Sequence, residues 1–172
     1  MNHGIQTIGS TRGTSSHHQN PFFMITDSNA TEETGNCYGF SFVYSGDFIG
    51  TAELDCFSQT RVLMGIHPDN FDWCLAPGES FHAPEVAMTY SANGMEKLSH
   101  NYHKAIRDNL CRGKHKYTRR PVLLNSWEGV YFTFTGEKLI EMAKEASELG
   151  VELFVMDDGW FGKRDNDQSG LG

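Results

Sequence analysis

Two short clusters of the sequence combine polar side chains with tryptophan. The first is Asn125-Ser126-Trp127-Glu128 and the second is Asp157-Asp158-Gly159-Trp160. A carboxylate can accept hydrogen bonds from two vicinal hydroxyl groups, and charge-assisted bonds of this kind contribute roughly 1.5–3 kcal/mol each. An indole face can cover the apolar C–H surface of a pyranose ring. Carbohydrate binding is therefore one interpretation of these clusters.

The adjacent carboxylates of Asp157 and Asp158 allow two other interpretations. Together they could bind Mg²⁺ or Ca²⁺, because both cations prefer oxygen ligands. Asp158 could instead cap a following helix. Gly159 permits a close approach of either backbone or ligand. The residue types alone leave all three interpretations open.

The segments around the two clusters predict a β-α-β unit. RRPVLLN (119–125) and VELFVM (151–156) are typical of strands buried in a parallel sheet. SWEGVYFTFT (126–135) reads as a loop, and GEKLIEMAKEASELG (136–150) as a helix that ends at Gly150. Functional residues of such repeats collect at the carboxyl ends of the strands, so the clusters should lie side by side. The expected apolar stripe of the helix is Leu139, Met142, Ala143, Ala146 and Leu149.

Residues 1–90 have the pattern of short strands separated by turns, which suggests a β-sandwich. In the segment 36–45, alternating aromatic residues predict one shared face, and Gly46-Asp47 predicts a hairpin to the strand 48–57. The aromatic residues are Tyr38, Phe40, Phe42 and Tyr44. The candidate strands are PFFMI (21–25), NCYGFSFVYS (36–45), FIGTAELDCF (48–57), RVLMGIH (61–67), FDWCL (71–75) and SFHAPEVAMTY (80–90).

A different pattern follows in residues 91–118. Apolar residues recur every three or four positions over 93–110, which predicts an amphipathic helix. Seven of the 14 Lys and Arg residues lie within 104–120, where Asp108 is the only acidic residue. This basic stretch could bind an anion or nucleic acid, but a solvated helix end is the favoured interpretation, because no aromatic-interleaved nucleic-acid motif accompanies it.

The composition excludes several classes of protein. With 172 residues and 12% aromatic residues, the chain is long and apolar enough for a folded core. No apolar run approaches the ~20 residues of a membrane helix, and the net charge of −8 argues against nucleic-acid binding. Its four cysteines form no CxxC pair, and the His100/His103 pair is weak evidence for a metal site, so we expect neither metal nor cofactor.

The longest specific motif is RPVLLNSWEGVYFTFTGEKLIEMAKEASELGVELFVMDDGWFGKRDND. It closely resembles the α-galactosidases of glycoside hydrolase family 36, and the resemblance extends from about Ile8 to Gly172. The resemblance implies a mixed β and α/β fold. Residues 1–90 would be the C-terminal part of a β-supersandwich, 91–118 a linking helix and basic segment, and 119–172 the first β-α-β unit of a (β/α)8 TIM barrel.

The resemblance also implies a retaining enzyme that releases terminal α-D-galactose from melibiose- and raffinose-type sugars. Trp127 would line the galactose pocket, and Asp157 and Asp158 would bind the sugar hydroxyls. Gly129 stands where the family usually has Ala, and Thr133 where it has Asp. The nucleophile and acid/base, which a retaining glycosidase needs ~5–5.5 Å apart, would lie beyond residue 172. We therefore expect an internal fragment that is inactive alone.

Two alternatives remain at this point. One is a fragment of a transferase similar to raffinose or stachyose synthase, and the other is a non-catalytic carbohydrate-binding β-sandwich. The β-α-β unit argues against the second, since such a module has no need of it. We expect a small oligosaccharide as partner, neither nucleic acid nor membrane, and a cytoplasmic location, because no secretory signal is evident. The family resemblance implies a homo-oligomer, a tetramer, for the full-length protein.

Overall fold

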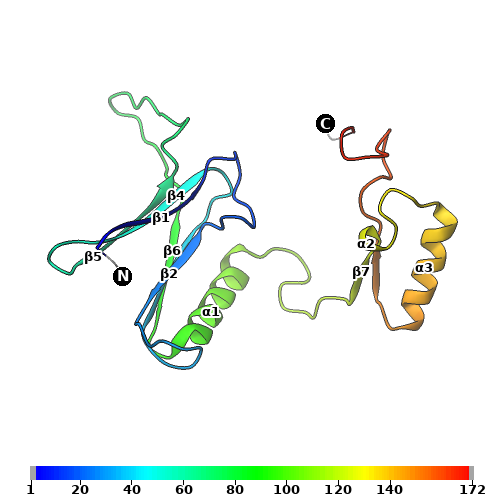
Figure 1. Ribbon diagram of the computed structural model, residues 1–172, viewed down its shortest axis with the longest axis horizontal. Coiled ribbons are helices and arrows are strands. Elements are labelled where there is room, and N and C mark those ends of the chain that lie inside the picture. Colours follow the sequence, from blue (N-terminus) through cyan, green and yellow to red (C-terminus); the bar gives the residue numbers. More distant parts are fainter. Residues whose placement is uncertain (1–2, 171–172) are drawn as a thin grey trace. The chain divides into compact units, whose positions relative to one another are not determined.

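The computed structural model describes residues 3–170 (Figure 1). The chain forms two compact units, Met1–Cys111 and Arg112–Gly172. Within the described part of the chain, no helix is long and apolar enough to cross a membrane.

The first unit contains two antiparallel sheets of three strands each. One has the order β1-β4-β5 and the other β2-β3-β6. The strands of the first sheet are β1 (Gly4–Ser10), β4 (Phe48–Leu54) and β5 (Thr60–Ile66). Those of the second are β2 (Phe22–Thr26), β3 (Cys37–Phe42) and β6 (Val86–Ser91).

Aromatic side chains pack between the two sheets. Phe23 of β2 stacks on Phe40 with ring centroids 5.2 Å apart. A Cβ atom on Gly50 of β4 would lie 3.0 Å from the Phe23 ring, so the two sheets are in close contact there. Phe40, Phe42 and Phe48 are buried. The predicted sandwich character of this region is therefore confirmed.

The helix α1 (Gly94–Ala105) covers the outer face of the sheet β2-β3-β6 (Figure 1). Gly39 of β3 permits this approach, since a Cβ atom there would lie 2.6 Å from the Tyr102 ring and 3.2 Å from Leu98. The Tyr102 hydroxyl donates a hydrogen bond to the carbonyl of Ala87 (3.0 Å). Burial raises the pKa of Tyr102 to about 12. The predicted helix over 93–110 is confirmed, but its last turn is the π-helix η1 (Ile106–Leu110).

The strands differ from the sequence prediction at several places; of the predicted strand 80–90, residues 80–85 lie outside β6. The prediction of a hairpin at Gly46-Asp47 is wrong, because β3 and β4 belong to different sheets and each already has a partner on both sides. The segment 71–75 is not a strand; its Phe71 and Trp73 side chains contact Phe81 instead. β1 was not predicted, since it lacks an apolar run and forms by pairing along its whole length with β4.

The second unit contains the predicted β-α-β unit. Its elements are β7 (Leu123–Asn125), α2 (Trp127–Val130), α3 (Gly136–Glu148) and β8 (Leu153–Val155). β7 and β8 are parallel, with Leu124 opposite Phe154. The α2 turn lies within the segment 126–135, which the sequence predicted as a loop throughout.

Local signals define both ends of α3. At its start, the Thr135 side chain accepts a hydrogen bond from the Lys138 amide (3.4 Å). At its end, the Val151 amide donates to the Ala146 carbonyl (3.0 Å) and the Gly150 amide donates to the Ser147 carbonyl (3.0 Å). With Gly150 at φ +89°, this is the Schellman arrangement that its position predicted.

The burial predicted for this unit is partly wrong. Leu123 and Leu153, expected to be buried in strands, are 52% and 42% exposed, because the described part of this unit covers the two-stranded sheet only partly. Leu139 and Ala146 of the predicted helix stripe are buried. Leu149 is 86% exposed, since it follows the last helical residue and no longer shares the buried face.

Candidate functional site

The ends of β7 and β8 bring the two polar clusters together. The Ser126 amide donates to the Val155 carbonyl (2.9 Å), and the Asp157 amide donates to the Ser126 hydroxyl (3.2 Å). The Asn125 side-chain amide donates to Oδ2 of Asp157 (2.6 Å). The predicted juxtaposition of the clusters is therefore observed, and direct hydrogen bonds hold it.

Trp127 begins the short helix α2 beside these bonds. Its backbone amide donates to Oδ1 of Asn125 (2.8 Å), which ties the start of α2 to the strand end. The half-buried indole meets the rings of Tyr131 and Phe132 edge-on, at centroid distances of 5.3 and 4.9 Å. Packing by two rings restricts the orientation of the indole.

Asp157 keeps part of its hydrogen-bonding capacity. Its Oδ1 accepts from the Asp158 amide (2.8 Å) and its Oδ2 accepts from Asn125. An ionised carboxylate offers about four acceptor positions. Two of them therefore remain for donors such as the hydroxyl groups of a ligand.

Asp158 has a different environment, because it forms an ion pair with Arg164. Its Oδ1 accepts from the Gly159 amide (2.7 Å) and from Nε of Arg164 (2.9 Å), and its Oδ2 accepts from Nη2 of Arg164 (2.6 Å). The Arg164 side chain is 4% exposed. Hydrogen bonds from Arg164 lower the pKa of Asp158, and the same bonds raise the pKa of Arg164.

These contacts bear on the two alternative interpretations of the aspartates. The described residues 159–170 contain turns and no helix, so Asp158 caps none there. Its partners are a cation and a backbone amide, which leave its oxygens poorly placed for a metal ion. No group of three or more His, Cys, Asp or Glu side chains that could hold a metal ion occurs in the described part of the chain.

A shallow, open depression of about 410 Å³ lies at the end of β8. Trp160, which lines it, has an indole that is 62% exposed and meets the Phe161 ring edge-on at 5.2 Å. Trp127 is not among the lining residues, although it lies at the neighbouring strand end. The lining residues are Val155, Met156, Asp157, Asp158, Trp160 and Phe161.

Sequence reasoning missed Arg164 and the bridging role of Ser126. Ser126, 2% exposed, joins the two strand ends and has no distinctive sequence signal. Arg164 follows the second cluster by a few residues. A basic residue close to two carboxylates was the available signal.

Comparison with known families places both units. Residues 1–76 match the glycosyl hydrolase family 36 N-terminal domain, and residues 80–172 match the melibiase family. The bifunctional alpha-galactosidase/sucrose kinase AgaSK of Mediterraneibacter gnavus is 51% identical over the whole chain, which spans 18% of that protein.

Solved structures agree with the sequence relatives. A stachyose complex of a variant of the alpha-galactosidase AgaA from Geobacillus stearothermophilus matches the whole chain with a TM-score of 0.92 and 50% identity. A raffinose complex of another AgaA variant matches 96% of it with a TM-score of 0.89 and 50% identity. The chain spans about a quarter of these structures. By its sequence in both units and by its fold, the chain belongs to glycoside hydrolase family 36.

Proposed function

We propose that the β7–β8 strand ends bind the terminal α-galactosyl unit of melibiose- or raffinose-type oligosaccharides, as part of a retaining α-galactosidase. The observation that carries the proposal is the Asp157 carboxylate, which keeps open acceptor positions and lines the same depression as the exposed indole of Trp160. Sugar hydroxyls would donate hydrogen bonds to the Asp157 carboxylate, while an apolar face of the sugar would pack on the Trp160 indole. The AgaA complexes with stachyose and raffinose support this class of ligand.

Within this proposal, Asp157 binds hydroxyl groups through its two open acceptor positions and Asp158 through the one position that Gly159 and Arg164 leave. Trp127 lines the galactose pocket from the neighbouring strand end, outside the depression at the end of β8. None of them is assigned a bond-breaking role. Hydrogen bonds from Arg164 lower the pKa of Asp158, so this carboxyl is a poor proton donor at neutral pH. As the family resemblance implies, we infer that the nucleophile and the acid/base are supplied from outside these 172 residues, at the ~5–5.5 Å separation that retention requires.

The proposal extends to the domain organisation. We assign residues 1–90 to a β-supersandwich, 91–118 to a linking helix and basic segment, and 119–172 to the start of a (β/α)8 barrel. The parallel pairing of β7 with β8 and their joining helix α3 support the last assignment. We further propose a homo-oligomer in the cytoplasm. The four free cysteines support a reducing compartment, and the oligomer can be measured by light scattering.

The test is hydrolysis of a chromogenic α-galactoside by the product of the complete gene that encodes this chain. We expect turnover with retention of configuration, and absence of turnover would overturn the proposal. Asp157→Ala should raise KM strongly, whereas Asp165→Ala, an exposed carboxylate in the same unit, should leave KM nearly unchanged. The 172-residue chain alone should be inactive, and turnover that survives its purification would contradict our placement of the reacting groups.

A further inference from the structure

The buried arginine of the second unit is not assigned to sugar binding in the function proposed above. A buried cation is costly unless it is paired and hydrogen-bonded. Arg164 meets that requirement through Asp158: Nε lies 2.9 and 3.0 Å from the two carboxylate oxygens, and Nη2 lies 2.6 Å from Oδ2. This forked geometry fixes the plane of the carboxylate as well as its charge.

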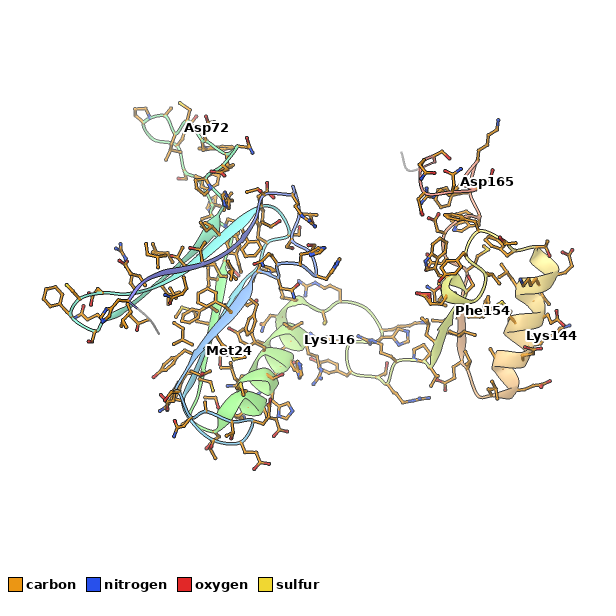
Figure 2. All side chains as sticks on the ribbon, in the orientation of Figure 1. Met24, Asp72, Lys116, Lys144, Phe154 and Asp165 are labelled. Atoms are coloured by element: carbon orange, nitrogen blue, oxygen red, sulfur yellow. The ribbon has the colours of Figure 1, made fainter. Side chains whose placement is uncertain are left out.

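The other edge of the guanidinium binds the backbone that follows. Nη1 donates to the carbonyls of Asn166 and Ser169, and the Asp167 carboxylate lies 3.5 Å from Nη2. These bonds close the segment after β8 into a compact turn around the arginine. In Figure 2 this segment, labelled at Asp165, curls back at the carboxyl end of β8.

The guanidinium of Arg164 also lies over an aromatic ring. Arg164 Cζ is 5.4 Å from the centroid of Phe132, which in turn meets the Trp127 indole edge-on at 4.9 Å. Gly159 allows this packing, since a Cβ atom there would lie 3.0 Å from the Phe132 ring. Asp158, Arg164, Phe132 and Trp127 thus form a continuous series of contacts between the two strand ends.

We propose that Arg164 is a positioning residue of this site, which holds the Asp158 carboxylate and, through Phe132, the Trp127 indole in the orientations that receive the sugar. The inference rests on the proposed function. Because both groups are fixed before the ligand arrives, less ordering is left for binding. Lysine cannot replace arginine fully here, because its compact ammonium group lacks the planar guanidinium geometry that binds both carboxylate oxygens at once.

The first experiment measures kcat and KM of the complete gene product with a chromogenic α-galactoside. Arg164→Gln should lower kcat/KM by about 10²-fold, the scale of a small misplacement of binding groups. Arg164→Lys should recover part of the loss. Lys163→Gln, a change at the adjacent exposed cation, should stay within about twofold of the parent. Equal activity of the parent and Arg164→Gln would overturn the proposal.

The second experiment is independent of catalysis. On the 172-residue chain, carbon NMR follows the titration of the Asp158 carboxyl, and proton NMR follows the Trp127 indole N–H. Both signals should change in Arg164→Gln and neither in Lys163→Gln. Unchanged signals would overturn the role of Arg164. If Arg164→Gln does not fold, the same comparison is made with Arg164→Lys, which keeps the buried cation.

The two experiments separate the two proposals. A complete gene product without α-galactosidase activity would overturn the proposed function. The NMR comparison would then still decide whether Arg164 orients Asp158 and Trp127.

Discussion

The two units of this chain reach order in different ways. The first buries apolar side chains between sheets and under a helix: Cys37, Phe40, Phe42, Phe48, Ala52 and Leu98. The second buries fewer apolar side chains (Val130, Leu139 and Ala146) and leaves Leu123 and Leu153 of its strands exposed, yet it buries Ser126 and Arg164 at the strand ends. The contrast indicates that polar bonds across the ends of two parallel strands can order a candidate site whose own sheet is sparsely covered.

The largest expected effect follows from truncating the core of the first unit. Phe48 of β4 is 0% exposed, so Phe48→Ala should destabilise the first unit by about 3–5 kcal/mol. Phe57→Ala removes a ring that is 79% exposed and should change stability by no more than about 0.5 kcal/mol. Denaturant unfolding with amide hydrogen exchange measures both. Equal effects of the two changes would contradict the core described here.

The next largest effect on stability is expected at the first residues of the two long helices, Gly94 of α1 and Gly136 of α3. Gly94 of α1 has φ +75°, and a Cβ atom there would lie 2.3 Å from the Glu32 carbonyl oxygen. Gly94→Ala should therefore cost at least the roughly 1–3 kcal/mol typical of a strained backbone residue. Gly136 of α3 has no atom within 4 Å of such a Cβ, so Gly136→Ala should stabilise by about 0.4–1 kcal/mol. Thermal unfolding of the two variants checks the opposite signs.

The same contrast explains which parts of the fold could be predicted. Helix α3 has its signals nearby in the sequence, at Thr135 and Gly150, and Gly150 ends the helix as predicted. Strand β1 and the separation of β3 from β4 depend on partners distant in the chain, so local pattern misjudged them. The segment 71–75 has the residue types of a strand but no strand beside it to pair with.

In the candidate site, too, some residues could be predicted from the sequence pattern and others could not. The position of Asp157 at a strand end beside Asn125 followed from the β-α-β pattern, because parallel strands end at one edge. Arg164 could not be found in this way. Its burial depends on a turn that folds back on the strand end, and neither periodicity nor spacing encodes such a turn.

The two units should also differ in their response to pH, beginning with acid. Hydrogen bonds from Arg164 hold the folded pKa of Asp158 below its usual value of 3.8. The stabilisation is therefore present in full above the unfolded pKa and is lost as the pH falls through the folded pKa. The stability difference between the parent and Asp158→Asn should shrink below pH 3.8. Asp165→Asn is the control, and a parallel trend in it would count against the ion pair.

In alkali the first unit should respond instead. Burial raises the pKa of Tyr102 from 10.0 to about 12, so its contribution is present below pH 10 and is lost as the pH rises through about 12. The stability difference between the parent and Tyr102→Phe should disappear over that interval. Tyr38→Phe, on an exposed side chain of the same unit, is the control. Tyrosinate absorbance and circular dichroism, recorded together, measure ionisation and unfolding.

The smallest expected effect concerns the residue that follows the C-terminal end of α3. Leu149 continues the apolar period of α3 in the sequence but lies beyond its last helical residue and is 86% exposed. Leu149→Ala should therefore change the free energy of unfolding by less than about 0.5 kcal/mol. Leu139 lies within α3 and is buried, so Leu139→Ala should lower the free energy of unfolding by about 2–5 kcal/mol. A cost for Leu149→Ala close to that for Leu139→Ala would mean that the Leu149 side chain is covered in solution.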